Sequence, residues 1–407
     1  MDVSVFTTIV LDGVGIGEQP DSVDFGDAGS DTLGHVCAHR VVRLPNLARL
    51  GLGRIRPLAG VDAVDAPIAS YGKLTEVSPG KDSTTGHWEL AGLVLDQAFP
   101  LYPDGFPEDV VEAFLAATGC PGLLGNRPAS GTEIIAALGA KHLETGAPIV
   151  YTSADSVFQV AAHVGVVPLE RQYEICRLTR EAVCVGRHAV GRVIARPFDG
   201  EPGSFARISP ARKDFSMRPP RPTLIDALQR QGVATVSIGK VHDLFGGTGF
   251  SETYKTRSNE HGIRTLVARM REAAHDGRPT FVWINLIDFD QEFGHRNDTE
   301  GFAKALEAFD RWIPSILALL PEDGRLAISA DHGNDPTTPG SDHSREYVPL
   351  LYYGAPETRD LGTRRSFCDH AATVAAFFGF ELETQATSFE QFVPADARSE
   401  TVSPAPR

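Results

Sequence analysis

The chain has 407 residues, of which 42% are hydrophobic and 22% charged, and its formal net charge is −15. This composition is typical of a globular protein and excludes collagen-like, coiled-coil and largely disordered chains. The acidic excess argues against nucleic acid or an anionic membrane as a partner, because both attract clustered lysine and arginine, whereas a small phosphate ligand needs only a local basic pocket.

Short runs rich in Val, Ile and Leu predict buried strands at 4–11, 233–238, 281–287, 325–330 and 348–353. Helix-like stretches lie between or beside them, at 42–51, 222–231, 260–274, 300–319 and 370–379. Strands that alternate with helices favour an α/β fold with a mostly parallel sheet flanked by helices on both faces.

The middle of the chain differs from its flanks. From about 100 to 218 turn residues are frequent and no long apolar strand run stands out, and its end is basic. We therefore predict a discontinuous core domain (1–99 and 219–393) and an inserted domain (100–218). The tail, 394–407, has almost nothing to bury and is predicted to be disordered.

The sequence gives no sign of a membrane or secretory protein. No apolar run approaches the roughly 18–20 residues of a membrane helix, and the start, MDVSVFTTIVLDG, has no basic region typical of a signal peptide. The five cysteines are far apart and form no CxxC pair, which favours reduced thiols. We expect a cytoplasmic protein.

Three of the predicted strands lead directly into acidic segments. Strand 4–11 runs into Asp12, strand 281–287 into Asp288-Phe289-Asp290 and then His295, and strand 325–330 into Asp331-His332, with His343 eleven residues further on. Because sites in open α/β sheets form beyond the carboxyl ends of strands, these segments are expected to converge. Six carboxylate and imidazole ligands suit two divalent metals, a typical arrangement for phosphoryl transfer.

Simpler interpretations compete with this one. An aspartate after a strand is usually a helix cap or a turn residue, which applies most strongly to Asp12 taken alone. Asp288 lies two residues before Asp290 and competes with it as a ligand. The segment Asp331-His332 with His343 is the hardest to explain as turn chemistry.

A row of hydroxyls, Ser83-Thr84-Thr85, precedes Gly86 and a helix-like stretch. A hydroxyl at a helix N-terminus lies where backbone N–H groups favour phosphate, and a metal could activate it as a nucleophile. The same pattern is also common as a plain helix cap. Local chemistry does not choose among the three hydroxyls, although the metal cluster favours the nucleophile interpretation.

Taken together, these segments resemble the phosphopentomutase family of the alkaline phosphatase superfamily. The matching stretches span nearly the whole chain and include GKDSTTGHWEL (80–90), YTSADSVFQVAAH (151–163), GRVIARPF (191–198) and ADHGNDPTTPGSDHSREYVPLL (330–351). The resemblance implies an alkaline-phosphatase-like core with an inserted smaller α/β cap domain. It also implies isomerisation of ribose 1-phosphate and ribose 5-phosphate, and of the 2-deoxyribose phosphates, as in nucleoside salvage.

The resemblance further implies roles for individual residues. It implies two manganese ions, one held by Asp12, Asp331 and His332 and the other by Asp290, His295 and His343. It makes Thr85 the residue that carries the phosphoryl group, primed by a sugar 1,6-bisphosphate activator. It places Ser153 and Asp155 near the sugar, and Arg192, Arg207 and Lys240 on the distal phosphate. Arg212 and Lys213 compete with Arg207.

This sequence departs from the family pattern at Gly13, where serine is common, and in the filling of the loop by Gln291-Glu292-Phe293. Neither departure removes a ligand. The partners expected are small pentose phosphates, with no nucleic acid, membrane or protein partner implied. Two rival classes are a phosphatase or another metal-dependent phosphomutase of the same superfamily, and a non-enzymatic metal- or phosphate-binding protein.

Overall fold

A computed structural model describes residues 4–153 and 156–390 of the chain. Contacts between residues divide the chain into two units. The first, which we call the core unit, consists of residues up to 97, 219–244 and those from 248 onward. The second, the insertion unit, consists of 98–218 together with 245–247. The inserted domain expected from the sequence, 100–218, overlaps the insertion unit, and the expected tail, 394–407, lies outside the described residues.

The core unit is built on an eight-stranded sheet with the order β10-β9-β11-β1-β12-β13-β2-β14. All neighbours are parallel except β12 with β13 and β13 with β2. The strands are β1 (Val5–Leu11), β2 (Ala69–Leu74), β9 (Ala234–Ile238), β10 (Glu252–Tyr254), β11 (Thr280–Leu286), β12 (Arg325–Ser329), β13 (Val348–Tyr353) and β14 (Asp360–Arg364). The predicted α/β class with a mostly parallel sheet is therefore confirmed.

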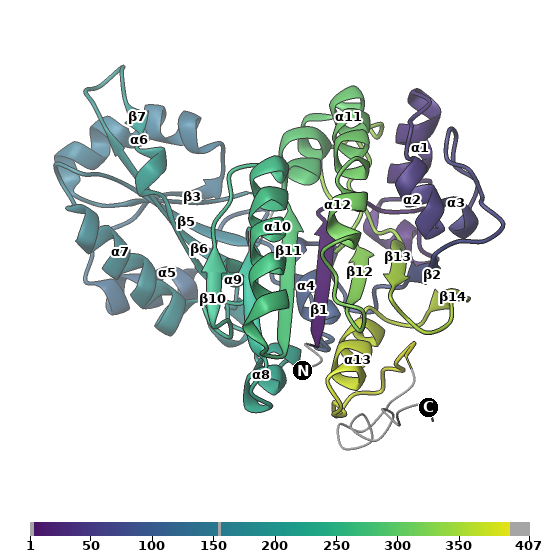
Figure 1. Ribbon diagram of the computed structural model, residues 1–407. Coiled ribbons are helices and arrows are strands. Elements are labelled where there is room, and N and C mark those ends of the chain that lie inside the picture. The colour runs from purple at the N-terminus through teal and green to yellow at the C-terminus, as the bar shows by residue number, and fades with distance from the viewer. Residues whose placement is uncertain (1–3, 154–155, 391–407) are drawn as a thin grey trace, which may run out of the picture. The chain divides into compact units, whose positions relative to one another are not determined.

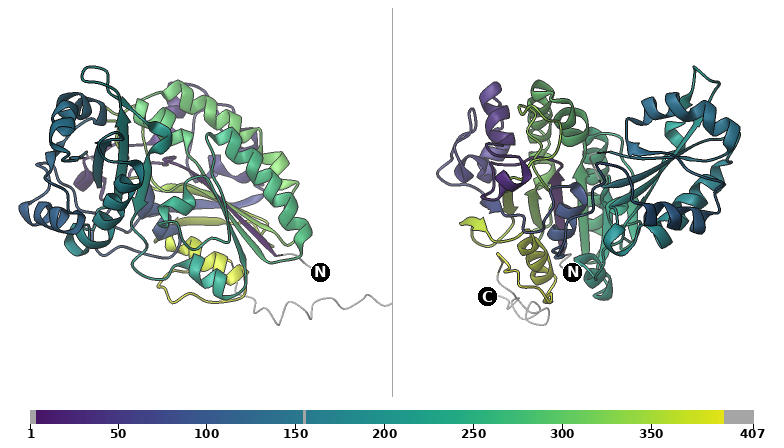
Figure 2. Two further views of the ribbon diagram at one scale, coloured as in Figure 1. Left: turned by 90° about the vertical axis from the view of Figure 1, so that its left-hand side faces the viewer. Right: turned by 180° about the vertical axis from the view of Figure 1, so that it is seen from behind.

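Helices cover both faces of this sheet. Viewed along its edge in the left panel of Figure 2, α10 and α11 lie on one side of the strands and α13 lies on the other. Strand β1 is buried along its whole length, which is why its sequence reads as one continuous run rather than an alternation. The helices are α1 (Thr32–His39), α2 (Pro45–Leu50), α3 (Leu52–Ile55), α4 (Ser83–Leu90), α8 (Leu224–Arg230), α9 (Val241–Leu244), α10 (Asn259–Asp276), α11 (Thr299–Asp310), α12 (Ile313–Leu317) and α13 (Cys368–Phe377).

The single helix predicted at 300–319 is two helices in the structure. Helix α11 ends at Asp310 and α12 starts at Ile313, with Pro314 in its first turn. Proline lacks an N–H group and fits only the first turn of a helix, so the second helix begins there. Across 4–153 and 156–390, no helix is both long and apolar enough to cross a membrane.

The insertion unit has its own sheet, which the sequence analysis did not foresee as strand runs. Its strands pair in the order β3-β4-β5-β6-β7, with β8 on β6. They are β3 (Leu124–Pro128), β4 (Ile149–Thr152), β5 (Val157–His163), β6 (Arg192–Asp199), β7 (Ala206–Arg207) and β8 (Lys213–Ser216). The accompanying helices are α5 (Glu108–Thr118), α6 (Gly131–Thr145) and α7 (Leu169–Leu178).

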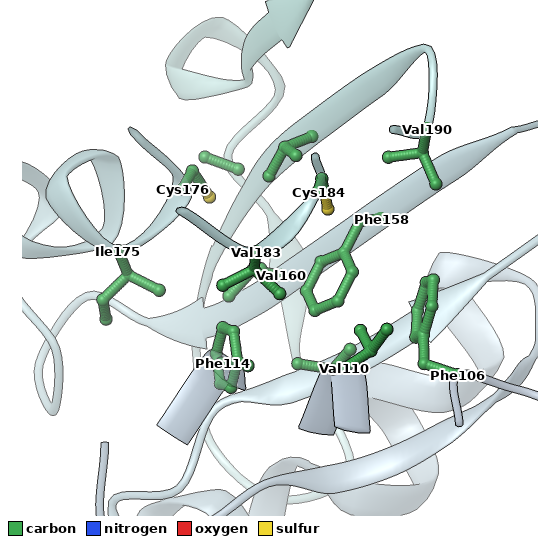
Figure 3. Packing of buried hydrophobic residues seen from close by; sticks show 13 residues of the cluster. Phe106, Val110, Phe114, Phe158, Val160, Ile175, Cys176, Val183, Cys184 and Val190 are labelled. Carbon is green, nitrogen blue, oxygen red and sulfur yellow. The ribbon is translucent and has the colours of Figure 1, made fainter. Parts of the chain in front are cut away.

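The sequence of strand β5 shows why the strands of this sheet were not predicted. Six of its seven residues are buried, yet its sequence, VFQVAAH, contains a glutamine and two alanines and so reads as only weakly apolar. Phe158 and Val160 pack into the apolar cluster of Figure 3, together with Phe106 and Phe114, whereas Ala161 belongs to a second cluster. A central strand with a core on each face tolerates small residues where the packing is tight.

The order of the core strands determines where the candidate site forms. Strand β1 is the immediate neighbour of both β11 and β12, and all three run parallel (Figure 1). Leu11 pairs with Leu286, so the chain leaves both strands at the same edge of the sheet. The acidic segments that follow these three strands therefore start side by side.

Candidate active site

The first ligand cluster consists of Asp12, Asp331 and His332. Each offers one ligand atom, and these atoms all lie within 4.8 Å of one another. The three side chains are fully buried. His332 Nε2 lies 3.4 Å from Asp12 Oδ1 and 3.5 Å from Asp331 Oδ2. A buried imidazole between two carboxylates is the donor set of a divalent metal site.

The second cluster consists of Asp290, His295 and His343. Asp290 Oδ1 lies 3.2 Å from His343 Nε2, and Asp290 Oδ2 lies 3.4 Å from His295 Nε2. The two Nε2 atoms are 3.2 Å apart. His332 joins the clusters, because its ring centroid is 4.0 Å from that of His343. The structure thus brings all six ligand candidates into one continuous group.

Asp288, which competes with Asp290 in the sequence, is used elsewhere. Its Oδ2 accepts a hydrogen bond from the backbone N–H of Asn259 at 2.7 Å, at the start of α10. Asp290 instead accepts a hydrogen bond from Asn334 Nδ2 at 2.7 Å, which fixes its carboxylate beside the histidines. The geometry therefore favours Asp290 over Asp288 as the ligand.

Hydrogen bonds to the outer nitrogens orient two of the histidine rings. His295 Nδ1 lies 2.5 Å from the carbonyl of Ser341, and His332 Nδ1 lies 3.0 Å from the carbonyl of Gly333. A carbonyl only accepts, so each Nδ1 carries the hydrogen. In the neutral rings the lone pair is then on Nε2, directed at the cluster, as in metal-ligating histidines.

The charges of the cluster perturb its protonation equilibria. Burial alone would raise the pKa of Asp331, but the neighbouring His332 and hydrogen bonding outweigh it and hold that pKa at about 2. Burial alone would lower the pKa of His295, but Asp290 raises it to about 9. Protons on the histidines thus offset the buried carboxylate charge, and a bound cation can replace them.

Buried oxygens without hydrogen bonds test whether these residues fit a metal. Asp12 Oδ2 and Asp331 Oδ2 are buried and have no hydrogen-bond partner. Asp331 Oδ2 does lie 3.1 Å from His87 Nδ1, but that nitrogen is closer, at 2.8 Å, to the carbonyl of Ser83. A buried carboxylate oxygen without a donor is costly, and coordination of a cation would satisfy it. The donor set fits a divalent metal.

The hydroxyl segment forms the N-terminus of α4, and Asp82 is its cap. Asp82 Oδ1 accepts the backbone N–H groups of Thr84 at 3.0 Å and Thr85 at 3.1 Å. The Thr85 hydroxyl donates to Asp82 Oδ2. The Ser83 hydroxyl instead lies 3.1 Å from His332 Nε2 and 3.4 Å from Asp12 Oδ1. The structure thus puts Ser83 next to the first cluster and turns Thr85, 1% exposed, toward Asp82.

The predicted substrate contacts fall in both units. Lys240 belongs to the core unit, and its Nζ lies 3.6 Å from Asp12 Oδ2. In the insertion unit, Ser153 follows β4, Arg192 opens β6 and Arg207 lies in β7. Asp155 lies outside the described residues.

Arg207 and its two competitors, Arg212 and Lys213, differ in the partners that they already have. Arg212 is held by Asp214 through hydrogen bonds of 2.8 and 2.7 Å, and Lys213 lies over the rings of Tyr173 and Phe215. Arg207 is exposed and forms no ion pair with any residue that the structure describes. Its guanidinium is therefore available to a ligand.

Two residues near the site were missed by the sequence analysis. His87 is fully buried, stacks on Trp283 and contacts Asp331. Arg345, 1% exposed, lies two residues after His343. The sequence signal for His87 and Arg345 was that each is a titratable or charged residue inside a matching motif. Their contacts with residues distant in the chain could not be read from the sequence.

The family comparison agrees with this site. The sequence model of the Metalloenzyme superfamily matches residues 4–382, so the chain belongs to that superfamily. A curated phosphopentomutase of Caldanaerobacter subterraneus subsp. tengcongensis is 50% identical over 95% of this chain and 97% of its own. One from Dictyoglomus thermophilum is 51% identical over 94% of this chain and 96% of its own. The chain belongs to the phosphopentomutase family and is an isomerase of that kind.

Proposed function

We propose that the chain interconverts ribose 1-phosphate and ribose 5-phosphate, and the corresponding 2-deoxyribose phosphates, through a phosphorylated Thr85. The observation that carries the proposal is the convergence of six ligand candidates, four of them buried, beside the hydroxyl-bearing N-terminus of α4. The roughly 50% identity to curated phosphopentomutases over nearly the whole chain supports the same reaction.

We assign the metal ligands in two sets. Asp12, Asp331 and His332 hold one ion, and Asp290, His295 and His343 hold the other; both are proposed to be manganese. Carboxylates mixed with imidazoles suit such an ion. When bound, the ions neutralise negative charge at the reacting phosphoryl group and stabilise the oxygens that attack and leave.

The chain's own groups carry the phosphoryl group between the two sugar positions. The free hydroxyl of the bound monophosphate attacks phosphorus and loses its proton, its new P–O bond forms, and the bond to Thr85 Oγ1 breaks as that oxygen takes up a proton. The resulting bisphosphate returns its other phosphoryl group to Thr85. Asp82 fixes the Thr85 hydroxyl by a hydrogen bond, and the first N–H groups of α4 favour negative charge nearby.

Basic residues bind the phosphate that is not reacting. We assign this role to Arg192 and Arg207 of the insertion unit and Lys240 of the core unit, with Ser153 and Asp155 near the sugar. The availability of Arg207 supports its assignment over Arg212 and Lys213. Arginine suits this task because its planar fork matches phosphate oxygens.

Three further points belong to the proposal. A sugar 1,6-bisphosphate primes Thr85, since a chain without the phosphoryl group cannot start the cycle. The partners are small pentose phosphates. The protein acts in the cytoplasm, which five unpaired cysteines support, because thiols stay reduced there.

The test is phosphorus NMR of ribose 1-phosphate incubated with the full chain, manganese and a catalytic amount of sugar bisphosphate. We expect ribose 5-phosphate to accumulate to equilibrium without inorganic phosphate, and we expect chelation of the metal to stop the reaction. Release of inorganic phosphate with no isomer would contradict the proposal and identify a phosphatase.

A further inference from the structure

Arg345 is a buried cation between two segments of the candidate active site. It is 1% exposed and follows the ligand candidate His343 by two residues. A long charged side chain is seldom buried this completely unless its charge and its hydrogens are satisfied. Its hydrogen-bond partners therefore show which parts of the molecule it holds together.

Three of these partners are backbone carbonyls of one loop. Nη1 donates to the carbonyls of Ser78 at 2.8 Å and Gly80 at 2.6 Å, and Nη2 donates to that of Glu76 at 2.8 Å. The remaining donors of Nη2 and Nε bind Asp21 Oδ2 at 2.9 and 3.1 Å. All five guanidinium hydrogens are used, and three fix alternate residues of the loop between β2 and α4.

That loop leads directly into α4 and lies close to the Thr85 hydroxyl. Gly80 is so close to Thr85 that a Cβ on Gly80 would lie 2.7 Å from Thr85 Oγ1. Two residues later, Asp82 caps α4 and receives the Thr85 hydrogen bond. The position of the Gly80 backbone, held by Arg345, therefore limits where Thr85 Oγ1 can lie.

The backbone around Arg345 is tied to the metal ligands. Ser344 and Gly333 exchange two backbone hydrogen bonds, of 3.1 and 2.8 Å, which join the segment after His343 to the residue after His332. The Arg345 N–H donates to Asp27 Oδ2 at 2.8 Å. Arg345 thus directly follows the residue that pairs with Gly333, and its side chain binds the loop between β2 and α4 (75–82), which we call the nucleophile loop.

We infer that Arg345 is a positioning residue that fixes the nucleophile loop, and with it Thr85 Oγ1, relative to the ligand cluster. The inference rests on the proposed function for its catalytic consequence. A plain ion pair would need only a cation 3.1 Å from Glu76 Oε2. Holding three carbonyls of alternate residues and the Asp21 carboxylate at once uses the five donors of a planar arginine fork, whereas a lysine ammonium has three.

The test compares Arg345→Lys with a matched control, Arg325→Lys, in the full metal-loaded chain. The Arg325 guanidinium also binds a carboxylate, Glu390, and two carbonyls, those of Asp323 and Gly324. It lies over the ring of Phe377, as Arg345 lies over that of Phe25. None of its described partners belongs to the nucleophile loop.

For Arg345→Lys we expect kcat to fall about 100-fold, the cost of misplacing reacting groups by about 1 Å. KM and bound manganese should stay close to wild type, and hydrogen exchange of amides 76–86 should become faster. Arg325→Lys should change none of these. Wild-type kcat in Arg345→Lys, or a loss of kcat matched by lost manganese, would overturn the inference.

If Arg345→Lys does not fold, the double variant Arg345→Met with Glu76→Gln removes the buried guanidinium together with the carboxyl group that faces it. The same fall in kcat, with faster exchange at 76–86, is expected, and wild-type turnover would overturn the inference. Failure of the proposed function is visible separately, because the wild type itself would then form no isomer. The exchange measurement does not depend on any reaction.

Discussion

The hydroxyl of Thr85 donates a hydrogen bond to the carboxylate of Asp82, with 2.5 Å between Thr85 Oγ1 and Asp82 Oδ2. The other oxygen of that carboxylate caps α4 through the N–H groups of Thr84 and Thr85. Asp82 therefore has two separable tasks, stabilising the helix and orienting the proposed nucleophile.

Asp82→Ala removes both tasks and Asp82→Asn removes mainly the second. We expect Asp82→Ala to lower the free energy of unfolding by about 1 kcal/mol, the usual value of a helix cap, whereas asparagine still caps. Both variants should lower kcat by roughly tenfold, because Thr85 is less well oriented. Urea unfolding and steady-state kinetics measure the two effects, and unchanged kcat in both variants would exclude an orienting role.

His343→Ala removes one ligand of the second proposed metal. Neighbouring side chains cannot replace it, since His295 and Asp290 already occupy the same cluster. We expect activity to fall by about two orders of magnitude or more, because losing even a partner that only orients a ligand costs about 10–100-fold, with less bound manganese and an intact fold. Metal analysis and circular dichroism check these outcomes. Full activity in a metal-replete assay would contradict the assignment.

Arg192→Ala tests the grip on the phosphate that is not reacting. This phosphate is bound in the ground state as well as in the transition state, so KM should rise at least as clearly as kcat falls. Losing a charge-assisted contact worth roughly 1.5–3 kcal/mol corresponds to about one to two decades weaker substrate binding. Arg187→Ala, an exposed arginine paired with Asp109, is the matched control. An unchanged KM for ribose 5-phosphate would assign Arg192 a structural role.

The pH dependence of stability has a specific source in His370. The ring is fully buried between the Thr8 hydroxyl and the Leu90 carbonyl, at 2.8 Å from each, and burial lowers the pKa of His370 to about 4. In the unfolded chain a histidine has a pKa near 6.5, so between pH 6.5 and 4 this residue is protonated in the unfolded state and neutral in the folded state. The contribution of His370 to the free energy of unfolding is therefore fully present above pH 6.5. It is lost as the pH falls toward 4, by about 3 kcal/mol in total.

A comparison with His370→Gln isolates this contribution. The variant is expected to be less stable than the wild type at pH 7.5, and its free energy of unfolding should fall less steeply between pH 6.5 and 4. Urea titrations across this range measure both slopes. Equal slopes would show that other groups cause the acid sensitivity.

Most of the central sheet could be predicted from the sequence, because strands buried on both faces need continuous apolar runs. The prediction at 348–353 coincides with β13, and that at 325–330 differs from β12 by one residue. Strand β2 was missed, since ASYGKL contains a glycine and a lysine and gives no such run. In the insertion unit, β5 was also not predicted, because its buried alanines make its sequence only weakly apolar.

The candidate site could be predicted in part. Parallel neighbours bring the ends of β1, β11 and β12 to one edge, so Asp12, Asp290 and Asp331 could be expected together. The different surroundings of Ser83 and Thr85 could not be predicted, because both are hydroxyls and their environment depends on side-chain packing. The role of Arg345 depends on partners, Glu76 and Asp21, that lie more than 260 residues away along the chain.

Phosphopeptide mapping tests the central claim most directly, because Ser83 rather than Thr85 lies beside His332 in the structure. The full chain is incubated with manganese and a sugar bisphosphate, its intact mass is measured, and the modified peptide is sequenced. We predict a gain of one phosphoryl group on Thr85 in the wild type and in Ser83→Ala, and none in Thr85→Ala. A phosphoryl group on Ser83 or Thr84, or a phosphorylated Thr85→Ala chain, would contradict the account.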